Sequence, residues 1–206
     1  MLSQESVRDI NFISLFDKPR DIYIFSVLLH NEITKTKNNL DVEMSIKELQ
    51  ETYKIFRGES KDDLFDFLNC LDKNIFSIYL LNEEKEILSY NIKSEYFDPK
   101  MKTFYLNVCL LKKLKINSQK IALYLISLGP HAKYLNLAFI ATLLGIEHKE
   151  QKLKQKAAKT AFDTLLKYNF IKSYDYDRKK KIFYFKMADL KLKEIVQDLP
   201  DKLDFN

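Results

Sequence analysis

Glycine, proline and cysteine are scarce in this 206-residue chain, and tryptophan is absent. Three glycines can scarcely supply a glycine-rich phosphate loop, and Cys70 and Cys109 lie too far apart for a Cys-x-x-Cys metal motif. Both cysteines sit among leucines, which predicts buried and reduced thiols of the kind usual in the cytoplasm. No apolar run approaches the roughly 20 residues of a membrane-spanning helix. The first residues include Glu5 and Asp9 and lack the pattern of a secretory signal. We therefore expect a cytoplasmic protein that makes no membrane contact.

Sequence signals of catalysis are also missing. The three histidines, His30, His131 and His148, are not paired at metal-ligand spacing, and no His-Glu-x-x-His motif occurs. The chain has 12 tyrosines, but none lies in the basic or metal-binding cluster that a strand-cleaving tyrosine would need. We therefore expect no enzyme, and neither catalytic residues, a metal nor a cofactor.

Positive charge is concentrated in one half of the chain. Residues 1–101 contain 13 Lys+Arg and 19 Asp+Glu, whereas residues 102–206 contain 21 Lys+Arg and 10 Asp+Glu. An acidic half followed by a basic half predicts that only the second half meets a polyanion. The alternative is a general abundance of lysine, which would not by itself explain the segregation.

The first half contains an ordered series of expected elements. Residues 1–18 are expected to be a flexible leader. Apolar periodicity, two capping boxes and polar turn residues then predict the following elements: a helix over 21–33, a strand over 41–44, a short helix after Ser45–Glu48, a helix after Ser60–Asp63, a hairpin over 75–81 and 86–96, and a strand over 102–109.

The second half follows the same order. The expected elements are helices over 116–128, 135–144 and 149–168, strands over 170–176 and 181–187, and a last helix over 188–196. Three helices followed by a β-hairpin or small antiparallel sheet, twice over, predict an α+β protein with two tandem winged helix-turn-helix domains. We place them at residues 19–110 and 111–206.

The third helix of the second half has a basic face. Its expected buried face contains Leu153, Ala157, Ala158, Ala161, Phe162, Leu165 and Leu166. A second face carries the lysine stripe, defined as Lys149, Lys152, Lys156 and Lys159. Stacked lysines repel one another, and a phosphate backbone would relieve that repulsion. Gln151 and Gln155 flank the stripe, and an amide can pair with an adenine edge. These residues predict duplex DNA binding; the alternative is an ordinary solvated lysine face.

The two expected hairpins differ in charge. The tip of the second, Arg178, Lys179, Lys180 and Lys181, is an uninterrupted basic run where a wing would reach DNA beside the recognition helix. The alternative is a solvated turn. The corresponding helix and tip of the first half carry Asp62, Asp63, Asp66, Glu83 and Glu84, which would repel phosphate. We therefore expect the first domain to serve protein interaction or self-association, the alternative being a purely structural role.

These patterns resemble the initiator replication proteins of theta-replicating bacterial plasmids. The resemblance covers about residues 20–187 and rests on the 21–33 helix, Ser45–Leu49, Leu64–Leu71, the 75–109 sheet, Ala122–Ile126, Leu143–Ile146 and Phe162–Ile171 leading into Lys179–Phe185. It implies two winged-helix domains, a homodimer held by the first domain, and a monomer that binds direct repeats at the origin. It also implies recruitment of host replication proteins. The chain departs from the pattern in its acidic 60–73 helix and in the absence of the usual glycine from the last hairpin.

The sequence thus predicts a sequence-specific double-stranded DNA-binding protein, with a plasmid replication initiator as the first hypothesis. The alternative within the same fold is a winged-helix transcriptional regulator. A third hypothesis is a protein-binding scaffold whose winged helices never meet nucleic acid, which failure to bind any duplex at low salt would select. The last is a strand-nicking enzyme, which metal-dependent nicking of supercoiled DNA would support.

Overall fold

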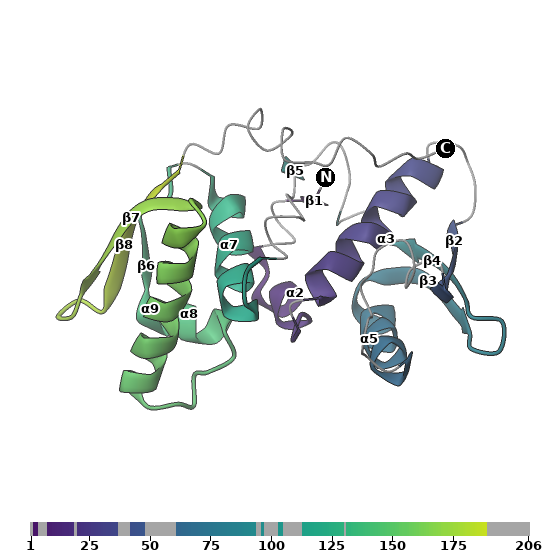
Figure 1. Ribbon diagram of the computed structural model, residues 1–206, viewed down its shortest axis with the longest axis horizontal. Helices are drawn as coiled ribbons and strands as arrows, with labels where there is room; N and C mark the ends of the chain where they lie inside the picture. Colours follow the sequence, from purple (N-terminus) through teal and green to yellow (C-terminus); the bar gives the residue numbers. More distant parts are fainter. Residues whose placement is uncertain are drawn as a thin grey trace. The chain divides into compact units, whose positions relative to one another are not determined.

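The computed structural model describes residues 2–3, 8–18, 20–36, 42–47, 61–93, 96, 103–104, 113–129 and 131–188. The chain divides into two compact units, Met1–Val108 and Cys109–Asn206, called here the first and the second unit. Both are α+β, and the described ranges contain six helices and small antiparallel sheets (Figure 1). No helix in these ranges is long and apolar enough to cross a membrane.

The second unit packs three helices on one side of a three-stranded sheet. In chain order its elements are α7 (Ile116–Leu128), β6 (Tyr134–Asn136), α8 (Leu137–Leu143), α9 (Gln151–Lys167), β7 (Ile171–Asp177) and β8 (Ile182–Met187). The antiparallel sheet has the order β6-β8-β7. Phe162 of α9 stacks on Phe183 of β8 with ring centroids 4.8 Å apart, and both rings are fully buried. The hydrophobic effect of this aromatic core holds α9 against the sheet.

Capping residues in the sequence determine where α8 begins and ends. The Asn136 side chain caps α8 by accepting a hydrogen bond of 2.7 Å from the Phe139 backbone N–H. Gly145 then adopts a φ of 66°, and the Ile146 N–H donates to the Ala141 carbonyl at 2.9 Å. This bond pattern is the Schellman ending of a helix, which favours glycine because only glycine takes a positive φ without strain. The chain can therefore turn sharply from α8 toward α9.

The first unit has the same connectivity in its described residues. Its elements are β1 (Leu2–Ser3), α2 (Ile10–Ser14), α3 (Asp21–Thr36), β2 (Val42–Ser45), α5 (Lys61–Asn74), β3 (Phe76–Asn82), β4 (Ile87–Ile92) and β5 (Thr103–Phe104). The sheet order β2-β4-β3 corresponds to β6-β8-β7, and β1 pairs separately with β5. A helix begins at Ile46, directly after β2, and corresponds to the start of α8; residues 48–60 lie outside the described residues.

The correspondence extends to individual hydrogen bonds. Ile46, the first residue after β2, donates its N–H to the Glu86 carbonyl at 2.8 Å. Leu137, the first residue after β6, donates to the Lys181 carbonyl at the same distance. Glu86 and Lys181 are 95 residues apart and have φ values of 53° and 55°. In both units this bond ties the end of the hairpin turn to the start of the second helix.

The hairpin turns themselves are built alike. The Asn82 side chain accepts a bond of 2.9 Å from the Lys85 N–H, and Asp177 accepts one of 3.0 Å from the Lys180 N–H. Such side-chain bonds shape Asx turns. The two acceptors are again 95 residues apart. The units therefore share a backbone plan although their sequences show no close identity.

Two expectations for the first unit need correction, and a third is covered only in part by the described residues. Part of the expected flexible leader, residues 1–18, is packed: Phe12, Ile13 and Phe16 are buried, and Phe12 stacks on Tyr96 with centroids 5.2 Å apart. Phe12 and Phe16 both contact Phe25 of α3, so these side chains add apolar area to the core around that helix. Cys70, expected to be buried, is exposed on α5. The strand expected over 102–109 is seen as Thr103–Phe104, and the rest of it, with Cys109, lies outside the described residues.

In the second unit, the helix expected over 135–144 begins two residues later. Leu135 instead belongs to β6 and pairs with Phe183 of β8, so a contact distant in sequence overrides the local helical pattern. α7 and α9 lie within two residues of their expected bounds. The helix expected over 188–196 lies outside the described residues beyond Ala188.

Candidate nucleic-acid interface

The lysine stripe lies on the solvent side of α9. Lys152 and Lys156 are exposed and Lys159 is partly exposed, and at 100° per residue the three fall within about 60° of the helix circumference. Lys149 is also exposed, but it lies in the turn before Gln151, where α9 begins. The structure therefore brings three of the four lysines onto one helical face and places the fourth just ahead of it.

No member of the stripe forms an ion pair with a carboxylate of the described residues. Asp163 stands one turn after Lys159 and would be the natural partner, but it accepts a short hydrogen bond from the Tyr174 hydroxyl of β7. Lys159 Nζ lies 5.7 Å from the ring centroid of Tyr176 instead, a cation–π contact that leaves its charge intact. Burial, and then the bond to Asp163, raises the pKa of Tyr174 to about 12. The phenol therefore remains a donor at neutral pH.

The two glutamines differ in accessibility. Gln151 is exposed in the first turn of α9, whereas Gln155 is partly buried. At 100° per residue Gln155 lies about 40° from Lys159 and about 100° from Lys156. Gln151 therefore has the freer amide of the two predicted base readers.

The hairpin tip, residues 178–181, carries four exposed cations. Its turn is fixed by Asp177, whose Oδ1 accepts bonds from the Lys179 and Lys180 N–H groups at 2.9 and 3.0 Å. The Asp177 carboxylate keeps its negative charge, so it offsets one of the four positive charges of the tip while it shapes the turn. With Lys181 bonded to Leu137, the tip has a defined position relative to α8. None of the four cations forms an ion pair with a carboxylate of the described ranges.

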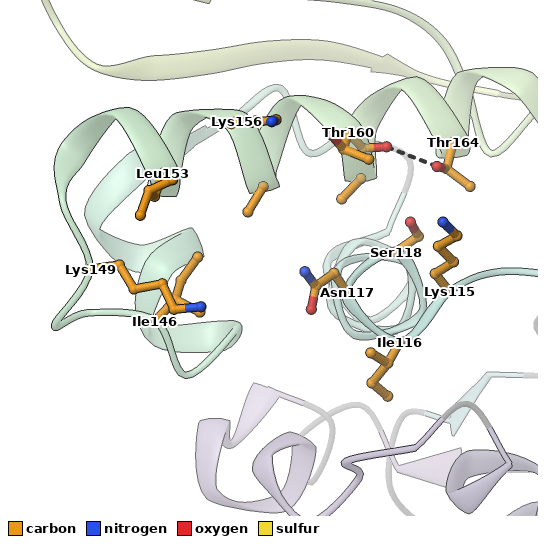
Figure 2. A pocket seen from close by; sticks show the side chains of 12 residues that line it. Lys115, Ile116, Asn117, Ser118, Ile146, Lys149, Leu153, Lys156, Thr160 and Thr164 are labelled. Carbon is orange, nitrogen blue, oxygen red and sulfur yellow. Dashed lines mark hydrogen bonds between the residues drawn. The ribbon is translucent and has the colours of Figure 1, made fainter.

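A groove runs along α9 beside the lysine stripe. Its volume is about 420 Å³, and Figure 2 shows it between α9, the first turn of α7 and the turn that holds Ile146 and Lys149. Leu153 forms part of its wall and is 50% exposed, although its spacing predicted a place in the buried face. Leu166, expected in the same face, is 39% exposed. The core face of α9 is narrower than predicted and consists of Ala158, Ala161, Phe162 and Leu165.

Two groove residues were not singled out by the sequence pattern. Lys115 and Asn117, at the start of α7, lie across the groove from α9 and add a cation and an amide to its rim (Figure 2). Lys115 follows Lys112 and Lys113 in a short basic stretch before the helix, and only the packing of α7 against α9 reveals its relation to Lys149 and Lys156.

The first unit carries acid where the second carries base. Glu83 and Glu84 lie 95 residues before Arg178 and Lys179, in the matching turn, and are exposed. Asp62 and Asp66 are exposed on α5. Asp63 pairs with Lys18 at 2.8 Å, with both side chains nearly half exposed. The same backbone plan thus presents opposite charges in the two units.

No group of three or more metal-ligating side chains occurs within the described ranges. His131 and His148 are exposed, and the side chain of His30 lies outside the described residues. Comparisons with protein-family models, with curated proteins and with solved structures found no match to this chain.

Proposed function

We propose that this chain is a sequence-specific double-stranded DNA-binding protein made of two tandem winged helix-turn-helix domains. Support comes from the order of elements, helix, strand, two helices and hairpin, with the last strand in the middle of the sheet. In a winged helix the third helix enters the major groove and the hairpin reaches the flanking backbone or minor groove. α9 and the hairpin tip are the elements proposed for these two contacts.

The observation that carries this proposal is the set of exposed cations without carboxylate partners on α9 and the hairpin tip. Lysine and arginine at phosphates release counterions and supply affinity, whereas base edges supply specificity. Gln151 is the candidate for base contact, because its amide can donate to and accept from an adenine. The other members of the interface, for which phosphate contact or a flanking role is proposed, are Lys149, Lys152, Gln155, Lys156, Lys159, Arg178, Lys179, Lys180 and Lys181.

We further propose that the protein is a replication initiator that binds direct repeats at an origin, as the resemblance to plasmid initiators implies. It would act by binding rather than by chemistry, and assembled copies would destabilise an adjacent A·T-rich segment for host replication proteins. The acidic surface of the first unit suits it to homodimer formation or another protein contact, because its carboxylates oppose phosphate. A transcriptional regulator is the alternative, distinguished by one palindromic operator in place of direct repeats.

A salt series tests the proposal. Binding of the full chain to the DNA around its own gene is measured between 50 and 200 mM salt, which is about the range over which counterion release is readily seen. Lys152→Glu with Lys156→Glu should lower the slope of log K against log salt by about 2, since each phosphate contact contributes about 0.9. Lys133→Glu with Lys186→Glu is the matched control, because both residues are exposed in the same unit, outside α9 and the tip. An equal loss in both double variants would contradict the assignment of the interface.

A further inference from the structure

The groove beside the lysine stripe has more apolar surface than a phosphate backbone can fill. Its lining includes the apolar side chains of Ile146 and Leu153 and the lysines Lys149 and Lys156, whereas the side chain of Ile116 points away from α9 (Figure 2). Phosphate and sugar offer no large apolar group for such a hollow. A peptide that alternates carboxylates with leucine or phenylalanine offers both parts, because its apolar side chains would lose water in the groove while its carboxylates meet the ammonium groups.

The chain itself contains such a peptide. Residues 194–206 carry four carboxylates and one lysine, interleaved with Ile195, Val196, Leu199, Leu203 and Phe205. By contrast, residues 113–188 contain five carboxylates in all, of which Asp163 and Asp177 accept hydrogen bonds as described above. Residues 194–206 therefore carry charge opposite in sign to that of the groove lysines, and apolar side chains that can pack on the apolar surface of the groove.

Chain length allows the two to meet. Ala188, the last described residue, donates its N–H to the Phe170 carbonyl at 3.1 Å, just beyond the end of α9. The next five residues can span up to about 17 Å. Between Leu153 and Thr164 the groove follows α9 for about 16 Å, and residues 194–206 can extend over more than that.

We propose that residues 194–206 dock in this groove within the same chain and shield Lys149 and Lys156. Docking does not depend on the proposed function. Its consequence does: a docked segment competes with DNA for those lysines, so the chain binds duplex through the fraction of molecules in which the segment is released.

Crosslinking in the full chain tests the docking. Phe205 is replaced by the photoreactive p-benzoylphenylalanine, and crosslinked peptides are mapped by mass spectrometry at low protein concentration. We expect monomeric products joined to the segments that line the groove, residues 115–118 and 146–161. Leu153→Gln should lower their yield several-fold. Leu166→Gln, an equally polar change at an exposed leucine of α9 that does not line the groove, should leave the yield unchanged.

Three crosslinking results would overturn the proposal. These are crosslinks only in dimers, which would make a second copy the donor of the segment, crosslinks elsewhere on the chain, and equal yields in the Leu153→Gln and Leu166→Gln variants.

DNA binding supplies the second measurement. Asp198→Asn, Asp201→Asn and Asp204→Asn together should tighten duplex binding by up to about tenfold if the segment covers the groove nine-tenths of the time. Asp62→Asn, Asp66→Asn and Glu84→Gln make the same change in net charge in the first unit and should have a smaller effect. If residues 194–206 crosslink to the groove but the chain binds no duplex, docking is supported and the proposed function is contradicted. If the chain binds duplex but gives no crosslinks to the groove, the proposed function is supported and docking is contradicted.

Discussion

Lys181 carries two constraints that its neighbours in the hairpin tip do not share. Its φ of 55° lies in the left-handed region, and its carbonyl accepts the bond from Leu137. A side chain in that region costs about 1–2 kcal/mol, which glycine would avoid. The residue thus combines an unfavourable backbone with a cation that the proposed interface uses.

Replacing Lys181 and Lys180 separately by glycine should distinguish backbone strain from charge. For Lys181→Gly the relief of strain offsets the greater unfolded-state freedom of glycine, so stability should stay within about 0.5 kcal/mol of the parent. Lys180→Gly, at a position without positive φ, should cost about 0.5–1 kcal/mol. Urea unfolding measures both. Each variant removes one cation, so the salt slope of DNA binding should fall equally in the two. A larger loss of stability in Lys181→Gly than in Lys180→Gly would contradict the strain argument.

A second prediction concerns the Tyr174 hydroxyl in alkaline solution. Its pKa is about 12 in the folded chain and about 10 unfolded, so the neutral phenol is favoured by folding. The stability from this group is therefore complete below pH 10 and is lost as the pH rises toward 12. Unfolding free energy measured across this window should fall more steeply in the parent than in Tyr174→Phe. Parallel curves would show that burial and Asp163 do not perturb this hydroxyl.

At the scale of the element, α9 has a core side and a groove side that sequence spacing did not separate. Leu165 is fully buried, whereas Leu153 borders the groove and is half exposed. Leu165→Ala should therefore destabilise the chain by about 2–5 kcal/mol, and Leu153→Ala by less than about 1 kcal/mol. Thermal and urea unfolding provide the measurement. A similar cost for both would mean that Leu153 belongs to the core after all.

The sequence was informative where structure depends on local signals. α7 was predicted with its observed bounds because a continuous apolar pattern ends at Gly129, and the turn of the second hairpin was predicted from its polar residues. β6 was missed because three residues are too few to show a period, and its pairing with β8 is set by contacts about 50 residues away. Leu153 was wrongly predicted to be buried, because the helical period identifies a face of α9 but does not show how far along that face another helix packs.

In the candidate site, too, the features that depend on local spacing were predicted and those that depend on distant contacts were not. Spacing alone grouped Lys152, Lys156 and Lys159 on one face of α9, as observed. It could not reveal that Asp163 is engaged by Tyr174, because that bond joins a helix to a strand. Nor could it reveal the groove, whose rim draws Lys115 from a different helix.

For the whole molecule, the two units present one backbone plan with opposite charges. Matching turns place Glu83 and Glu84 where the second unit has Arg178 and Lys179. Counterion release requires cations at phosphates, so under the proposed function we expect the second unit to supply most of the salt dependence of DNA binding. The first unit would then contribute through protein contacts, with Leu80, 65% exposed on the edge strand β3, as one apolar candidate.

The unit Cys109–Asn206, produced alone, should fold and keep most of the salt slope of the full chain. The described core of this unit is formed by its own residues, because Phe162, Leu165 and Phe183 all belong to it and are fully buried. Circular dichroism checks folding, and the salt series checks binding. In the full chain, Glu83→Gln with Glu84→Gln should leave the slope unchanged, because carboxylates that stand away from DNA displace no counterions. If these amides raised the slope, or if the isolated unit folded but lost most of it, the first unit would lie against the duplex and the division of labour between the two units would be wrong.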